Sequence, residues 1–184
     1  MATARFVIGV DVGGTKVSVA TMHGGRVGEP LVAPTDRSSA DALIAQLVDQ
    51  IRSAAGEATP DAVGIGVPSV VEFATGRARS SVNVPLQDVP LRTVMAERLG
   101  LPVFVDNDAT VAALAEAHDE HGKLDVHSLV MLTIGTGVGG GIVIDGRAYR
   151  ALWRRIADRR AKRGNLAFTR VHPARHFLHV ALPS

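Results

Sequence analysis

The stretch FVIGVDVGGTKVSVATM, residues 6–22, decides how the rest of the chain is interpreted. Two apolar runs rich in β-branched residues flank the pair Gly13–Gly14, which is the pattern of a β-hairpin. Thr15 precedes Lys16, and an alternating strand follows where a Walker loop would open a helix. We therefore expect two antiparallel strands joined by a glycine turn, and not a Walker loop.

Beyond this hairpin the chain alternates between strand and helix patterns. A third strand is expected before the first helix, where Leu43, Leu47 and Ile51 recur at every fourth position behind capping serines. The later segments predict, in order, a buried strand stopped by a proline, a short helix, a strand and a helix: residues 61–71, 90–100, 102–108 and 109–122. This order predicts an α/β fold whose mostly parallel sheet is opened by an antiparallel hairpin.

A second strand, glycine turn and strand occur in SLVMLTIGTGVGGGIVIDGRAY, residues 128–149. The echo of the first hairpin predicts two lobes, one covering residues 1–122 and a second that begins at residues 123–149. Residues 135–140 also fit the dinucleotide pattern G-x-G-x-x-G, but a strand follows where that site needs a helix. A glycine hairpin is therefore the preferred interpretation.

Composition and charge limit the classes of protein. At 184 residues and 46% hydrophobic content the chain can bury a core, and no apolar run nears the roughly 20 residues of a membrane span. With no leader-like start, we expect a cytoplasmic protein without a membrane partner. The absence of cysteine excludes disulfides and thiolate metal sites. Residues 1–149 carry 11 basic and 17 acidic side chains, whereas residues 150–184 carry 9 and 1.

Both glycine turns can present backbone N–H groups to phosphate, because glycine adopts positive φ and lets an anion approach closely. A tight hairpin needs glycine in any case, so one such turn alone leaves both interpretations open. Two similar turns favour phosphate. Asp11, at a strand end, can hold hydrated Mg²⁺, and Thr15 and Lys16 can donate to phosphate oxygens.

The segment FVDNDAT places Asp108 between a buried strand and a helix. Phosphoryl transfer to an alcohol needs a carboxylate that orients the hydroxyl and takes its proton, and Asp108 fits that role. The same residue type also caps helices, and the two roles can coexist. His118 and His121 have the spacing of a metal pair, but solvated residues near a helix end are the preferred interpretation.

Together these motifs resemble the ROK family of sugar kinases and repressors, most closely its bacterial glucokinase-like members, over about residues 6–149. The matching segments are DVGGTK, GIGVPSVVEFATGRARSSVNVPLQDVPL, VDNDATVAALAE and LTIGTGVGGGIVIDGRAY. The resemblance implies the actin-like, ribonuclease-H-like ATPase fold. It also implies that Asp108 activates the 6-hydroxyl of a sugar held by Asn83 and Asn107. The groups that hold the ATP phosphates and Mg²⁺ would be Asp11, Gly13, Gly14, Thr15, Lys16, Gly135, Thr136 and Gly137.

The resemblance implies that the chain descends from hexose kinases that use ATP and Mg²⁺, with glucose the first candidate substrate. Such a kinase would phosphorylate a carbohydrate at the start of glycolysis. Its partners would be a sugar and ATP, and a homo-oligomer is compatible with the family. Ser69 stands where the family usually has glycine. After Tyr149 the sugar-binding Glu-x-Gly-His motif and the zinc-binding cysteines are absent, so we expect little or no kinase turnover. An inactive fragment or a sugar-binding remnant is the alternative.

The tail of residues 150–184 differs in composition from the rest. Its Arg, Ala, Pro and His content suggests a coding frame shifted near codon 150, which the nucleotide sequence of the gene would test. The competing interpretation is a basic helix in YRALWRRIADRRAKR, residues 149–163, for a nucleic acid or a membrane surface. We do not favour it, because ROK repressors bind DNA through an amino-terminal domain for which Phe6 leaves no room.

Overall fold

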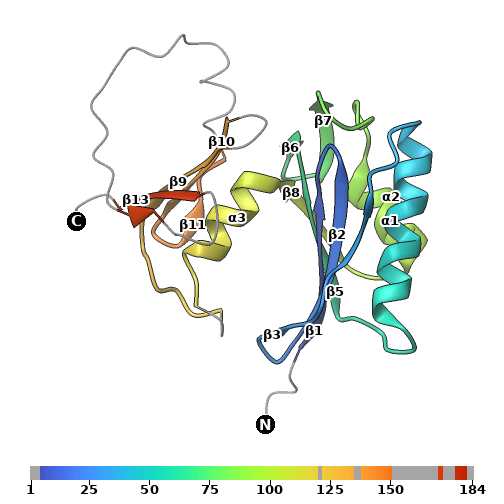
Figure 1. Cartoon of the computed structure of the whole chain (residues 1–184), viewed down its shortest axis with the longest axis horizontal. Helices are drawn as coiled ribbons and strands as arrows, with labels where there is room; N and C mark the ends of the chain where they lie inside the picture. The colour runs from blue at the N-terminus through green and yellow to red at the C-terminus, as the bar shows by residue number, and fades with distance from the viewer. Residues whose placement is uncertain (1–4, 120–121, 135–137, 151–169, 172–176, 182–184) are drawn as a thin grey trace. The chain divides into compact units, whose positions relative to one another are not determined.

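The computed structural model of this chain describes residues 5–119, 122–134, 138–150, 170–171 and 177–181. The chain divides into two units, residues 1–108 and residues 109–184 (Figure 1). The boundary falls after the first residue of helix α3 (Asp108–Glu116), so the chain passes from one unit to the other within a single helical turn.

The first unit is built on a six-stranded sheet with the order β3-β2-β1-β5-β8, in which β4 also pairs with β2. Its strands are β1 (Phe6–Val12), β2 (Lys16–His23), β3 (Arg26–Val27), β4 (Leu31–Pro34), β5 (Ala62–Val67) and β8 (Val103–Asn107). Strands β1, β5 and β8 are parallel, and β2 pairs antiparallel with β1, β3 and β4. The opening hairpin is confirmed, with more antiparallel pairing than we expected.

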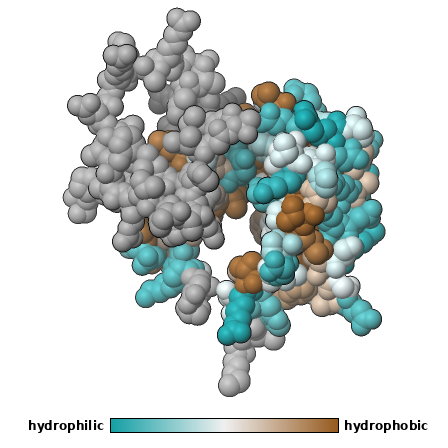
Figure 2. All heavy atoms as spheres, in the orientation of Figure 1, coloured by the Kyte–Doolittle hydropathy of each residue, from teal (hydrophilic) through white to brown (hydrophobic). Residues whose placement is uncertain are grey.

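Two helices cover one face of this sheet (Figure 1). Helix α1 (Ala40–Ala55) begins after Ser39, whose side chain accepts from the Ala42 amide, and helix α2 (Leu91–Leu99) ends at Gly100 in the left-handed conformation. Alternate residues of β1 are buried with the helices in one core, and its Asp11 lies on the other face. In Figure 2 the described surface of this unit is largely hydrophilic, with hydrophobic residues in isolated spots.

A two-stranded hairpin, β6 (Ser69–Glu72) and β7 (Arg77–Ser81), follows β5 directly after Pro68. We expected the strand to stop at this proline but did not expect a second hairpin. Its polar sequence, RARSS in β7, lacks the alternation that marks a half-buried strand. The hairpin leads into the loop of residues 82–90.

The second unit combines α3 with a five-stranded sheet in the order β11-β10-β9-β13-β12. The strands are β9 (Leu129–Ile134), β10 (Val138–Ile144), β11 (Arg147–Ala148), β12 (Arg170–Val171) and β13 (Phe177–Ala181). Strands β9 and β10 form the expected second hairpin, and β13 pairs with the other edge of β9. The basic helix considered for residues 149–163 lies almost entirely outside the described residues.

The glycines of β10 permit close packing against α3. A Cβ added to Gly141 would stand 2.4 Å from the Cβ of Ala113 and 2.6 Å from the carbonyl oxygen of Ala109. A strand can approach a helix this closely only where neither carries a bulky side chain. This part of the glycine run therefore serves packing, and β10 excludes the helix of a dinucleotide site.

Helix α3 ends at Glu116, and the expectation that it would continue to Gly122 is wrong. The backbone turns after Ala117, and His118 forms an isolated bridge to Leu124. A ring nitrogen of His118 hydrogen bonds to the carbonyl of Leu114 at 2.7 Å. In the part of the chain that the structure describes, no helix is long and apolar enough to cross a bilayer.

Candidate active site

The carboxyl ends of β1, β5 and β8 gather three carboxylate residues around one glycine. Gly66 of β5 pairs with Asp11 of β1 on one side and with Asp106 of β8 on the other. Since neighbouring strands lie about 4.8 Å apart, the Cα atoms of Asp11 and Asp106 are about 10 Å apart. The Cα of Asp108 lies 3.4 Å from the point that a Cβ on Gly66 would occupy. Gly66 therefore lies directly beside Asp108, at an ordinary contact distance.

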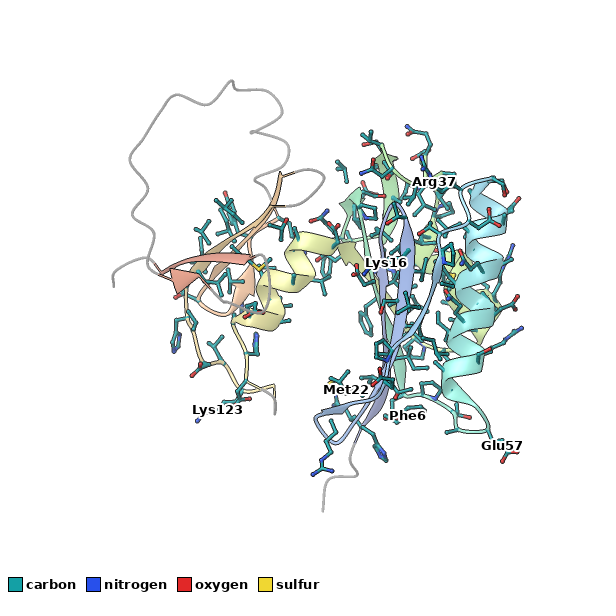
Figure 3. All side chains as sticks on the ribbon, in the orientation of Figure 1. Phe6, Lys16, Met22, Arg37, Glu57 and Lys123 are labelled. Atoms are coloured by element: carbon teal, nitrogen blue, oxygen red, sulfur yellow. The ribbon has the colours of Figure 1, made fainter. Side chains whose placement is uncertain are left out.

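The glycine turn between β1 and β2 is closed by a hydrogen bond from the Gly13 amide to the carbonyl of Lys16, at 2.8 Å. Neither Gly13 nor Gly14 has positive φ, so the conformational reason that we gave for these glycines is wrong. Close approach requires them instead: a Cβ on Gly13 would stand 2.9 Å from the Lys16 carbonyl oxygen. The side chains of Thr15 and Lys16 are exposed. Lys16 is labelled in Figure 3.

Burial raises the pKa of the Asp11 carboxyl above its ordinary value, while the charge of Lys16 acts in the opposite direction. The residue as a whole is exposed at the surface, so the desolvation of its carboxylate is only partial and the group is reachable. Such a carboxylate gains from a nearby cation, because the ionised form is disfavoured by burial alone. A partly dehydrated oxygen ligand at a strand end is suited to a hard divalent cation.

Strand β8 passes directly into α3 at Asn107 and Asp108. The Asn107 side chain donates from Nδ2 to Oδ1 of Asp108 at 2.9 Å and to the carbonyl oxygen of Ser69 at 3.3 Å. Its backbone N–H donates to Oδ1 of Asp106 at 2.9 Å. Asp108 is the first residue of the helix. The hydrogen bond from Asn107 restrains the orientation of its carboxylate.

Asn83, from the loop after β7, lies against the glycine turn. Its Cβ is 3.0 Å from the point that a Cβ on Gly14 would occupy. The loop is tied back by Arg79, which donates to Asp88 and to Glu72, each at 2.9 Å. The hydrogen bond from Arg79 lowers the pKa of Asp88. Residues from the sugar-loop region and from the first phosphate motif thus meet within the first unit.

The structure therefore brings most of the predicted residues to one edge of the first unit. These are Asp11, Gly13, Gly14, Thr15, Lys16, Asn83, Asn107 and Asp108. Gly135, Thr136 and Gly137, expected to hold further phosphate oxygens, lie outside the described residues. The prediction missed Gly66, although a glycine inside a buried strand signals close approach of another backbone. It also missed Thr35, whose hydroxyl donates to the Gly13 carbonyl.

A sheet of this order, with a glycine hairpin and carboxylates at one edge, defines the actin-like ATPase fold of sugar kinases. The sequence profile of the ROK family matches residues 7–152, and the chain belongs to this family.

Three relatives illustrate the match. A glucokinase of Halalkalibacterium halodurans is 38% identical over 149 residues, covering 77% of this chain and 45% of its own length. A xylose repressor of Caldicellulosiruptor bescii is 40% identical over 89 residues, covering 48% and 22%. The crystal structure of a ROK family glucokinase from Streptomyces griseus, in complex with glucose and AMPPNP, aligns with a TM-score of 0.71 at 32% identity, covering 79% and 46%. The chain thus spans about half the length of the kinases that it matches.

Proposed function

We propose that this site serves the ATP-dependent phosphorylation of a hexose at its 6-hydroxyl, with glucose the preferred substrate, in the cytoplasm. The observation that carries the proposal is the shared neighbour Gly66. It pairs with Asp11 beside the glycine turn and lies next to Asp108, the residue that directly follows β8. A base for the alcohol and a carboxylate for the metal are thereby brought to one edge of one sheet.

Asp108 acts as the base in this proposal. Its carboxylate accepts the proton of the 6-hydroxyl as the oxygen attacks the γ-phosphorus of ATP, and the bond to the ADP oxygen breaks. The hydrogen bond from Asn107 to Oδ1 restrains the orientation of the Asp108 carboxylate. Asn83 and Asn107 supply amide groups to the sugar hydroxyls, which are both donors and acceptors.

The glycine turn and Asp11 serve the nucleotide. The main-chain N–H of Gly14 and the side chains of Thr15 and Lys16 would donate to phosphate oxygens, while the Gly13 N–H closes the turn onto the Lys16 carbonyl. The residues fit Mg²⁺, since Asp11 offers a carboxylate that solvent can reach and neither Gly13 nor Gly14 carries a Cβ that would block a hydrated ion. When bound, Mg²⁺ neutralises charge on the phosphates during transfer. Gly135, Thr136 and Gly137 would complete the phosphate contacts.

The comparisons support this proposal through the kinases that the chain resembles, one of them solved with glucose and AMPPNP. The match to a xylose repressor leaves regulation by sugar binding as an alternative for the same fold. An enzyme that uses ATP and a small sugar needs neither membrane nor nucleic acid. Self-association, as a homo-oligomer, is compatible with the proposal.

The test is a coupled assay of ADP release with glucose, mannose and N-acetylglucosamine, together with calorimetric titration of each sugar. We expect glucose to bind and turnover to be low, and we expect Asp108→Asn to abolish this residual turnover while glucose still binds. Asp49→Asn, on the exposed side of α1, is the matched control and should leave both unchanged. Absence of sugar binding, with a salt-dependent shift of DNA, would favour a regulator instead.

A further inference from the structure

Thr35, the residue after β4, contacts two carbonyl groups of the glycine turn. Its hydroxyl donates to the carbonyl oxygen of Gly13 at 2.7 Å. Its backbone N–H donates to the carbonyl oxygen of Thr15 at 3.0 Å. Thr35 therefore holds the carbonyl groups of Gly13 and Thr15, the two residues on either side of Gly14 at the tip of the turn.

Fixing these carbonyls also fixes the amide groups that follow them. In a trans peptide the carbonyl of one residue and the N–H of the next point to opposite sides of the plane. With the Gly13 carbonyl held by Thr35, the N–H of Gly14 points away from Thr35. The same relation directs the N–H of Lys16 away from Thr35. The orientation of the phosphate-facing amides thus depends on a hydroxyl outside the glycine motif.

Thr35 is itself held firmly from both sides. Gln46 of α1 donates from Nε2 to the carbonyl oxygen of Pro34 at 2.7 Å, and its Oε1 accepts from the Asp36 amide at 2.8 Å. Helix α1 is anchored in the core by residues next to Gln46, including the fully buried Leu47. The chain from Gln46 through Thr35 to the turn is therefore a continuous set of hydrogen bonds that starts in a rigid element.

We propose that Thr35 is a positioning residue for the triphosphate, and that its hydroxyl holds the Gly13–Gly14 peptide so that the turn meets the phosphates of a nucleoside triphosphate. This inference rests on the proposed function. A glycine turn without Cβ atoms gains orientations when it is released, because glycine has the largest backbone freedom of any residue. Ordering that turn in advance lowers the cost of binding an anion.

The experiment compares Thr35→Val, which keeps the shape and removes the hydroxyl, with Thr35→Ser, which restores it. Thr93→Val, the same change at an exposed position of α2, is the control. Two readouts are used on the full chain. One is the affinity for Mg²⁺–AMPPNP with the ³¹P line width of each phosphate, and the other is hydrogen exchange at the Gly13 and Thr35 amides.

We expect Thr35→Val to exchange these two amides about three- to tenfold faster, and to bind AMPPNP weaker by a similar factor, since one neutral hydrogen bond is lost. Thr35→Ser should restore both, and Thr93→Val should change neither. Unchanged amide exchange in Thr35→Val would overturn the proposal. Faster exchange with unchanged AMPPNP affinity would also overturn it, since Thr35 would then serve only the fold.

The two proposals fail differently. If the unaltered chain bound no AMPPNP, the proposed kinase function and the positioning role would both be lost, whereas the exchange data would still establish or reject the hold on the turn. If the unaltered chain bound AMPPNP and Thr35→Val bound it equally well, only the positioning role would be lost.

Discussion

The side chain of Asn83 packs against the main chain of Gly14, with its Cβ 3.0 Å from the point that a Cβ on Gly14 would occupy. A residue of the proposed sugar loop thus touches the tip of the proposed phosphate turn. A carbon atom added at Gly14 would therefore have to push Asn83 back by a few tenths of an ångström.

Gly14→Ala is therefore expected to weaken glucose binding about three- to tenfold, the effect of losing one hydrogen bond to the sugar. The backbone of Gly14 lies outside the left-handed region, so alanine fits it, and the fold should persist. The displaced group is Asn83. Titration calorimetry with glucose measures the change.

Gly64→Ala is the matched control, because no atom of the described residues lies within 4 Å of an added Cβ there. It should bind glucose like the unaltered chain. Equal losses in Gly14→Ala and Gly64→Ala would contradict the importance of the contact with Asn83.

Arg79→Gln should loosen the loop that carries Asn83. Arg79 joins Glu72 of β6 to Asp88 beyond β7, and all three side chains are exposed. Ion pairs in this setting are screened by salt. We expect glucose affinity in the unaltered chain to fall modestly between low and high salt. Arg79→Gln should start lower and show a weaker dependence, since Arg77 still pairs with Asp88 at 3.4 Å. Arg26→Gln, on β3, should behave like the unaltered chain.

Asp11→Asn should raise the stability of the magnesium-free chain at neutral pH. Burial raises the pKa of Asp11, so the folded state holds a proton more tightly than the unfolded state does. Stability therefore falls as pH rises from the unfolded pKa through the folded pKa, and the ionised carboxylate carries a penalty above that range. Asparagine removes this penalty.

Thermal unfolding at neutral and at acidic pH checks this expectation. The advantage of Asp11→Asn should shrink as pH falls through the raised pKa of Asp11. Added Mg²⁺–AMPPNP should stabilise the unaltered chain more than the variant, because Asp11 is the proposed cation ligand. A variant that is less stable at neutral pH would speak against a desolvated carboxylate.

Ser69→Ala should stabilise the fold by about 1 kcal/mol. Ser69 is only 3% exposed, and its Oγ has no hydrogen-bond partner among the described residues, so the hydroxyl is buried without compensation. Ser81→Ala is the opposite case, since that hydroxyl donates to the carbonyl oxygen of Pro68 at 2.8 Å. It should destabilise by about the same amount. Urea unfolding measures the free energy of unfolding of both variants. A lower free energy of unfolding in Ser69→Ala than in the unaltered chain would contradict this reasoning.

Hydrophobic periodicity was sufficient to predict the elements that bury a face. Helix α1 shows it well, since Leu43, Leu47 and Ile51 are buried as their spacing indicates and Ser39 caps the helix. The end of α3 could not be predicted in this way, because the turn after Ala117 depends on backbone pairing of His118 with Leu124. The β6–β7 hairpin was missed because it is held by polar contacts across strands, which leave no apolar alternation.

The candidate site divides in the same way. Asp11, Asn107 and Asp108 lie at the ends of strands that their apolar sequence runs predict. Because these strands are parallel, the sequence also predicts that the three residues lie at one edge of the sheet. The roles of Gly66 and Thr35 depend on which backbone lies opposite them. Sequence spacing carries no such information, since Thr35 and Gly13 are 22 residues apart.

The direct passage from β8 into α3 leaves no spare residue between Asn107 and Asp108. An insertion or deletion here would rotate the helix by about 100° per residue and swing the carboxylate out of place. The geometry of the site therefore fixes the length of the chain at this junction. We expect proteins that keep this carboxylate in its role to keep the junction at a constant length.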